Sequence, residues 1–207
     1  MSVPSAHGPL GSKIVLVLWV VVAVGAYGIG TFPTAQIVGR RLGRDPTREG
    51  SGNPGATNVY RTAGRRAGLL VGVVDVAKGA IPTAAGYLID GRPLATVAWI
   101  AAVAGHVLPL TRQWRGGKGV ATAAGGAVVL HPLVALALAA VFAIIARVTG
   151  RASIGSLAIA ALLPIGVAIT GRPAWEVAAA AALGLLVLVR HGANVRRLLA
   201  GTEQTYR

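Results

Sequence analysis

The sequence contains no cysteine, only six acidic residues and only two phenylalanines. Without cysteine, the chain has no disulfides, no thiolate metal ligands and no cysteine nucleophile. Charged residues make up 13% of the chain, about half the share in a typical soluble domain, whereas 54% of the residues are hydrophobic. Such a composition excludes a disordered chain. The 207 residues suit six to eight membrane spans of about 20 residues joined by short loops, which indicates a polytopic membrane protein.

Charge of one sign dominates, with 20 Lys and Arg giving a net charge of +14. An excess of basic over acidic residues of this size is also typical of proteins that bind nucleic acid. The basic residues, however, lie in short segments between apolar runs, where the orientation of a membrane protein places them, so no nucleic-acid partner is expected. The histidines lack neighbouring carboxylates at ligand spacing, and we therefore expect neither a metal nor another cofactor. The four are His7, His106, His131 and His191.

Apolar runs predict an all-α integral membrane protein with seven transmembrane helices. A run of 28 residues, 119–146, is interrupted by His131-Pro132, and the proline disfavours helical geometry at the residue before it. If this run is two helices, sixteen Lys and Arg share a side with the C-terminus and three lie on the other. A single helix would move the basic residues after it to the other side and reduce this difference. Because Lys and Arg concentrate on the cytoplasmic side, we expect two helices, with the N-terminus outside and the C-terminus in the cytoplasm. The predicted spans are 14–38, 69–89, 94–110, 119–130, 132–146, 154–170 and 174–189.

The prediction is a single membrane domain over residues 1–207. Its parts outside the spans are an extracytoplasmic tail (1–13), a cytoplasmic loop (39–67), a cytoplasmic glycine-rich loop (111–118) and a cytoplasmic tail (190–207). The fourth span is a difficulty, because a helix over 119–130 is only about 18 Å long against about 30 Å of hydrocarbon. Neighbouring helices must protect it, or the membrane must be thinner there.

The first cytoplasmic loop contains an unusual density of Gly, Ser and Asn. Asn53 before Pro54 predicts the N-cap of a short helix that runs to about Ala63 and ends at Gly64. Thr57, Asn58 and Arg61, spaced by three and four residues, then share one face of this helix. The N-terminus of the helix lies next to them and favours binding of an anion. The alternative is an ordinary solvated basic loop. The candidate binding residues here are Ser51, Gly52, Asn53, Thr57, Asn58 and Arg61.

The second loop, WRGGKGVAT, precedes a predicted span directly. Gly116 and Gly117 allow a ligand to approach the backbone closely, Lys118 adds charge, and the following helix adds its dipole. It is not a Walker A sequence, because Gly119 rather than Ser or Thr follows the lysine. Anion binding is the hypothesis and a plain turn the alternative, with Thr122 in the first turn of the helix as a further candidate.

Three further groups of polar residues belong to the spans and the tail. Asp75 and Lys78 lie on one helical face and predict a buried ion pair. His106 is a functional candidate within a span, or else makes a packing hydrogen bond. The tail places several polar residues near one stripe, and its alternative is a basic amphipathic anchor on anionic lipid. The tail candidates are His191, Asn194, Arg197 and Glu203.

These motifs together resemble one family. GSGNPGATNVYRTAG (50–64), DVAKG (75–79), AGHVLP (104–109), GGKGVAT (116–122) and the N-x-x-R-L-x-x-G-x-E tail (194–203) are similar to motifs of the bacterial acyl-phosphate:glycerol-3-phosphate acyltransferases, the PlsY family. The motifs occur in the family's order from about Val15 to Glu203.

The resemblance implies an inner-membrane enzyme with a cytoplasmic active site. It would move a fatty acyl group from acyl phosphate to the sn-1 hydroxyl of glycerol-3-phosphate, giving lysophosphatidic acid and inorganic phosphate. It also implies that the substrate phosphate, not a protein side chain, accepts the hydroxyl proton. The residues implied to hold the acceptor, and so to be catalytic, are Ser51, Arg61, Lys118, Asn194 and His191. The glycines at 116, 117 and 119 would shape the phosphate-binding turn, and Asn53, Thr57 and Asn58 would order the first loop.

The residues themselves agree with this expectation, since they supply anion donors and no obvious general base except a histidine. His106 or His191 as the base is therefore the alternative mechanism. A transporter for a phosphorylated or other anionic solute is the alternative function, although no repeated, broken helices are evident. Expected partners are the two substrates, membrane lipids and an enzyme that produces acyl phosphate, with the chain a monomer or weak oligomer.

Overall fold

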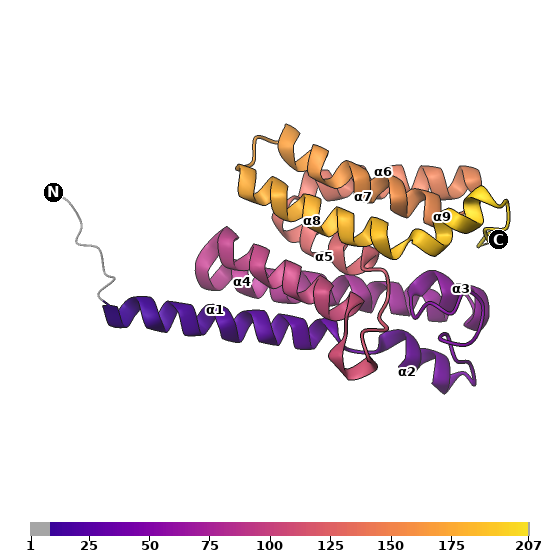
Figure 1. The fold of residues 1–207 in the computed structure, drawn as a ribbon, viewed down its shortest axis with the longest axis horizontal. Helices are drawn as coiled ribbons and strands as arrows, with labels where there is room; N and C mark the ends of the chain where they lie inside the picture. Colours follow the sequence, from indigo (N-terminus) through magenta and orange to yellow (C-terminus); the bar gives the residue numbers. More distant parts are fainter. Residues whose placement is uncertain (1–8, 207) are drawn as a thin grey trace.

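The computed structural model describes residues 9–206, and every regular element in that range is helical. The predicted tail 1–13 lies mostly outside the described residues. Figure 1 shows the helices running roughly along one direction, with α2, α3 and α9 near the same end as the C-terminus. The elements are α1 (Pro9–Gly30), α2 (Thr34–Arg41), α3 (Ala56–Ala63), α4 (Arg65–Val107), the 3-10 helix η1 (Leu110–Arg112), α5 (Val120–Leu130), α6 (Pro132–Thr149), α7 (Ala152–Ile169), α8 (Ala174–Arg190) and α9 (Gly192–Leu199).

One predicted span is broken in the structure, and two others follow each other without a loop. The first apolar run, 14–38, is interrupted, because α1 ends at Gly30 and α2 begins after Pro33, whose ring disfavours helix at the residue before it. The runs 69–89 and 94–110 are the two halves of α4. They meet at Asp90 and Gly91, and Gly91 has φ +67°, which only glycine adopts readily. The chain therefore reverses at these two residues, without a separate loop between the two halves.

The hinge between the fourth and fifth predicted spans is confirmed. Helix α5 ends at Leu130, His131 has non-helical backbone angles, and Pro132 is the first residue of α6. By length and apolar composition, four helices in the described range could cross a membrane, or five if α8 and α9, bent by 53°, count as one. Helix α5, with eleven residues, is too short to be among them.

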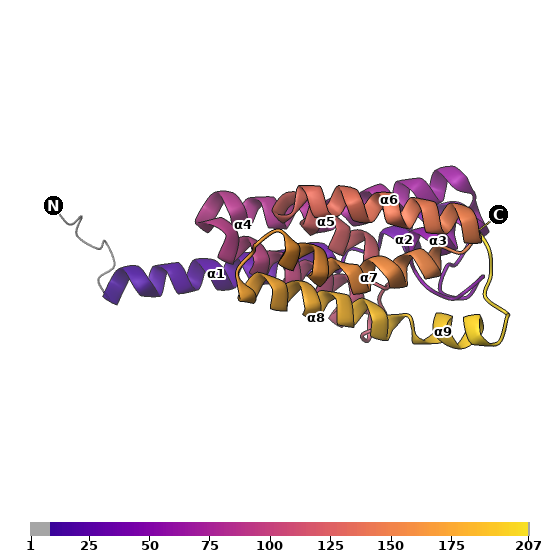
Figure 2. The ribbon, with the colours of Figure 1, turned by 90° about the horizontal axis from the view of Figure 1, so that it is seen from above.

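The short α5 is covered by its neighbours, as the sequence required. In Figure 1 it lies between α4, in the α1–α4 group, and the α6–α8 group, and in Figure 2 it lies beside α4 and overlaps α6, both of which it contacts. The indole of Trp99 donates a hydrogen bond of 3.0 Å to the carbonyl of Ala123, and Arg92 donates one of 3.0 Å to the carbonyl of Leu130. Arg92 is itself held by two hydrogen bonds, of 2.7 and 2.5 Å, to the buried carboxylate of Glu176 in α8. The short helix is thus tied to both groups at once.

Candidate active site

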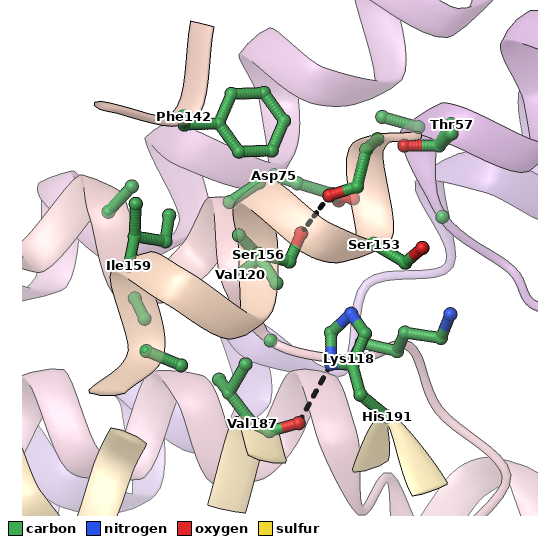
Figure 3. A pocket seen from close by; sticks show the side chains of 18 of the residues that line it. Thr57, Asp75, Lys118, Val120, Phe142, Ser153, Ser156, Ile159, Val187 and His191 are labelled. Atoms are coloured by element: carbon green, nitrogen blue, oxygen red, sulfur yellow. Dashed lines mark hydrogen bonds between the residues drawn. The ribbon is translucent and has the colours of Figure 1, made fainter. Parts of the chain in front are cut away.

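A cavity of about 350 Å³ opens between these two groups of helices, and its two ends differ in chemistry. Figure 3 shows Thr57, Ser153, Lys118 and His191 on one side of it and Phe142 and Ile159 on the other. The apolar walls come from α5, α6, α7 and α8 and include Leu138, Phe142, Ile159, Leu163, Leu183 and Val187. The cavity can therefore hold a molecule that is charged at one end and apolar at the other.

The first loop reaches the polar end through α3, but that helix starts later than predicted. Its N-cap is Gly55, with extended backbone, and not Asn53, so the N-cap prediction is wrong. Pro54 and Gly55 separate Asn53 from the first helical residue, Ala56, and the N–H of Gly55 donates to the carbonyl of Asn53 at 2.9 Å. The predicted end is confirmed, since Gly64 terminates the helix with φ +94°.

Asn58 orders the loop that precedes its own helix. Its side-chain oxygen accepts a hydrogen bond of 2.9 Å from the backbone N–H of Ser51, and its amide donates to the carbonyls of Pro46 and Glu49. The side chain is 2% exposed. Asn58 thus fixes where Ser51 stands at the cavity, in agreement with the ordering role that the resemblance implied for it.

The glycine-rich loop is held from both sides and delivers Lys118 to the cavity. Arg190 donates to the carbonyl of Gly116 at 3.0 Å, and the N–H of Gly117 donates to the carbonyl of His106 at 3.1 Å. Gly119 then takes φ +84° as the N-cap of α5. The first turn of α5 consequently faces the cavity, and the N–H groups of a helix N-terminus favour an anion there.

Lys118 begins a chain of hydrogen bonds that reaches the C-terminal tail. Its ammonium donates to the Asn194 oxygen at 2.5 Å, and the Asn194 amide donates to one oxygen of the Glu203 carboxylate at 2.6 Å. Arg197 donates to the other oxygen at 2.7 Å. The tail therefore positions the ammonium through a buried amide, with Asn194 only 4% exposed.

The charges of this chain are set by burial and by their partners. Burial, with a smaller effect from nearby arginines, lowers the pKa of Lys118 to about 8 against the opposing attraction of Glu203. Burial raises the pKa of the Glu203 carboxyl, but its hydrogen bonds and the charge of Arg197 outweigh this and keep it below the ordinary value. At neutral pH Lys118 is an ammonium and Glu203 a carboxylate, and a partly dehydrated ammonium attracts a phosphate strongly.

Two histidines line the cavity in different ways. Nδ1 of His191 lies 2.8 Å from the carbonyl of Val187, which can only accept, so Nδ1 carries the hydrogen and Nε2 is left as an acceptor. His106 instead packs against the glycine-rich loop, with Nδ1 4.0 Å from the carboxylate of Asp75. Asp75 forms the predicted buried ion pair with Lys78, at 2.7 Å.

Most of the predicted site residues meet at this cavity, and five do not line it. Those that line it are Ser51, Asn53, Thr57, Asn58, Arg61, His106, Lys118, Gly119, His191, Asn194 and Glu203. Those that do not are Gly52, Gly116, Gly117, Thr122 and Arg197, of which Gly116 and Gly117 pack against α4 and Arg197 supports Glu203.

The sequence prediction missed the contribution of α7. Ser153 and Ser156 line the cavity from the first turns of that helix. The available signal was two serines three residues apart in an otherwise apolar run. In a membrane helix, however, a serine hydroxyl also donates a hydrogen bond to a backbone carbonyl of the preceding turn, so a serine there does not by itself indicate a site. Ser156 donates such a bond to the carbonyl of Ala152 at 2.9 Å.

The structure is a helical bundle of the membrane-protein type, and its cavity has hydrogen-bond donors for an anion at one end and apolar walls at the other. These features define a class of integral membrane protein that binds an anionic, lipid-like molecule. Residues 20–201 match the glycerol-3-phosphate acyltransferase family, and the chain belongs to that family. It is an acyltransferase of this class.

Relatives and solved structures agree over nearly the whole chain. The glycerol-3-phosphate acyltransferase of Syntrophotalea carbinolica is 41% identical, covering 90% of this chain and 97% of the relative. That of Trichlorobacter lovleyi is 36% identical, covering 88% and 95%. Crystal structures of PlsY (YgiH), an integral membrane glycerol 3-phosphate acyltransferase, in glycerol 3-phosphate and lysophosphatidic acid forms, superpose with TM-scores of 0.87 and 0.84. Each is 32% identical and covers 90% of this chain and 94% of the crystallised one.

Proposed function

We propose that this enzyme transfers a fatty acyl group from acyl phosphate to the sn-1 hydroxyl of glycerol-3-phosphate. The products are lysophosphatidic acid and inorganic phosphate. The observation that carries the proposal is the single cavity with cationic donors at one end and apolar walls at the other. Both substrates carry phosphate groups, and one carries an alkyl chain, so the two ends of the cavity match the two kinds of substrate chemistry.

The polar end holds the glycerol-3-phosphate. Lys118 and Arg61 neutralise phosphate charge, and Ser51 adds a hydroxyl donor. Asn194 keeps the ammonium in place, and Nε2 of His191 accepts a hydrogen bond from a glycerol hydroxyl. The acyl chain lies along the apolar walls, where Phe142 and Leu138 from α6 face Ile159 and Leu163 from α7.

The reaction needs a positioned nucleophile more than a strong base. The sn-1 oxygen attacks the acyl carbonyl carbon, the new C–O bond forms, and the bond from that carbon to the phosphate oxygen breaks. The departing phosphate takes the hydroxyl proton, so no protein side chain changes its charge. Phosphate is a good leaving group, and positioning and charge neutralisation then supply most of the rate enhancement.

The test of this function is an assay on protein purified in detergent. Labelled glycerol-3-phosphate is offered with palmitoyl phosphate, palmitoyl-CoA or palmitoyl carrier protein in separate reactions. Lysophosphatidic acid with the acyl phosphate alone supports the proposal. Product only with a thioester contradicts the proposed donor, and no product with any donor in folded protein contradicts the function in favour of transport.

We further propose seven spans in the cell inner membrane, formed by α1, the two halves of α4, α5, α6, α7 and α8. The site, the loop 39–67 and the tail 190–207 then face the cytoplasm, and residues 1–13 lie outside. The position of α2, α3 and α9 at one end of the bundle supports this arrangement (Figure 1). Because the chain has no cysteine, single cysteines report topology cleanly. In intact cells, an impermeant maleimide should label Arg172→Cys and should not label Arg41→Cys, which is also exposed; the reverse pattern contradicts the orientation.

The pKa of Lys118 gives the reaction an expected alkaline limit. Below about pH 8 the ammonium is charged, and as the pH rises through that value it loses its proton and its attraction for phosphate. The second phosphate ionisation, near pH 6, limits the acid side. We expect kcat/KM for glycerol-3-phosphate to rise through about pH 6 and to fall above about pH 8. Lys118→Arg should remove the alkaline fall from whatever activity it retains; an unchanged fall contradicts the assignment.

A further inference from the structure

The last described residues, 203–206, form an extended strap that crosses the cytoplasmic end of the bundle. Gly201 ends the α9 region with φ +69°, and the chain then runs without regular structure. The strap lies beyond residues 20–201, which are those that match the family. It connects α9 to the α6–α7 turn and to α3, three elements that are far apart in the sequence.

Three successive carbonyl groups of the strap accept hydrogen bonds from two arginines. The carbonyl of Glu203 accepts from Nε of Arg151 at 3.3 Å. Those of Gln204 and Thr205 both accept from Arg61, at 2.9 Å each, from Nη2 and Nε. Nη1 of Arg61 also lies 3.4 Å from the side-chain oxygen of Gln204.

Tyr206 anchors the strap at its end. Its hydroxyl donates to the carbonyl of Ala146 at 3.0 Å, and its backbone N–H donates to the carbonyl of Gly150 at 3.0 Å. Its ring meets that of Tyr60 edge to face, with centroids 6.4 Å apart. Tyr60 directly precedes Arg61 on α3. The same tyrosine therefore fixes the strap against the α6–α7 turn and against the helix that carries Arg61.

The consequence for Arg61 is a fixed side chain with donors to spare. A guanidinium has five N–H groups, and the strap takes three of them: those of Nε and Nη2 on one edge go to backbone carbonyls, and one of Nη1 goes to the Gln204 side chain. The remaining two are on Nη1 and Nη2, at the end of a side chain that also lines the cavity. A long arginine side chain loses conformational entropy when a ligand immobilises it, and that loss weakens binding. A strap that immobilises it beforehand removes that cost from substrate binding.

We propose that the strap 203–206 is a positioning element that pre-organises Arg61 for the phosphate of the acceptor, with Tyr206 as its anchoring residue. The inference rests on the proposed function of Arg61 as a phosphate ligand. Residues 204–206 of the strap do not line the cavity, and their effect reaches the reaction through the guanidinium of Arg61.

The test compares Tyr206→Ala with Gln204→Ala in the full chain. Tyr206→Ala removes both the hydroxyl bond and the ring contact, whereas Gln204→Ala keeps the backbone carbonyl and loses only the contact of 3.4 Å. We expect Tyr206→Ala to raise KM for glycerol-3-phosphate about tenfold with kcat within about twofold, and Tyr206→Phe to fall between it and the wild type. Gln204→Ala should change KM less than twofold. An unchanged KM in Tyr206→Ala, or a lower KM from release of an inhibitory strap, overturns the proposal.

A double-mutant cycle separates positioning from general destabilisation. Binding of glycerol-3-phosphate is measured by calorimetry in wild type, Tyr206→Ala, Arg61→Ala and the double variant. Because the strap acts through Arg61, Tyr206→Ala should weaken binding in the wild type and add nothing once Arg61 is absent. An equal loss in both backgrounds contradicts the proposal. Failure of the proposed function is distinct, because wild-type protein would then yield no lysophosphatidic acid.

Discussion

Lys118→Ala is expected to lower kcat/KM for glycerol-3-phosphate by about a thousandfold or more while the protein stays folded in the membrane. The change removes the ammonium that Asn194 holds at the cavity, and the guanidinium of Arg61 is fixed elsewhere by the strap, so it cannot take that place. Removing a single donor at a site of developing charge already costs about a hundredfold to a thousandfold. It also leaves the Asn194 oxygen without its 2.5 Å donor beside Glu203.

Initial rates with palmitoyl phosphate measure this effect, and the chain offers a matched control. Lys13→Ala removes an exposed lysine near the start of α1 that does not line the cavity, and should leave kcat/KM unchanged. Lys118→Arg keeps the charge but not the compact ammonium, so it should recover only part of the loss. Wild-type turnover by folded Lys118→Ala contradicts its place at the phosphate.

The sequence was sufficient to predict several helix boundaries at a proline or glycine, although the break before Pro33 within the run 14–38 was missed. His131-Pro132 marked the boundary of α5, and the pairing of Asp75 with Lys78 followed from their spacing. The uneven distribution of Lys and Arg between the two sides added a prediction of how the chain is oriented in the membrane, which the pattern of any single helix does not contain. These features depend on residues close together in the chain, and local rules are adequate for them.

Other features depend on contacts between distant segments, and the sequence contained no local signal for them. The carbonyls that hold Arg61 come from residues more than 140 positions away. Nothing in the motif identifies backbone oxygens as its partners. Likewise, Ser153 and Ser156 join the site only because α7 packs against α6 and α8, a pairing that apolar periodicity does not specify.

The role of His106 can be decided by Gly117→Ala, alone and combined with His106→Ala. A methyl group at Gly117 would overlap Nε2 of His106 and lie 2.9 and 3.1 Å from two further ring atoms. All three are atoms of one side chain, and that side chain is 6% exposed and has little room to move. We expect Gly117→Ala alone to displace the glycine-rich loop, and Lys118 with it, and to lower kcat/KM at least about a hundredfold.

If His106 only packs against the loop, His106→Ala should retain activity within about tenfold of wild type, and the double variant should match it. The two changes are then strongly non-additive, because the second removes the atoms with which the first collides. Gly25→Ala is the control, since a methyl group there meets nothing within 4 Å. If His106 were instead the general base, both variants that lack it would be folded and inactive, and the double variant would recover nothing. The contacts of the ring with Gly117 favour packing, which is consistent with phosphate itself accepting the proton of the hydroxyl.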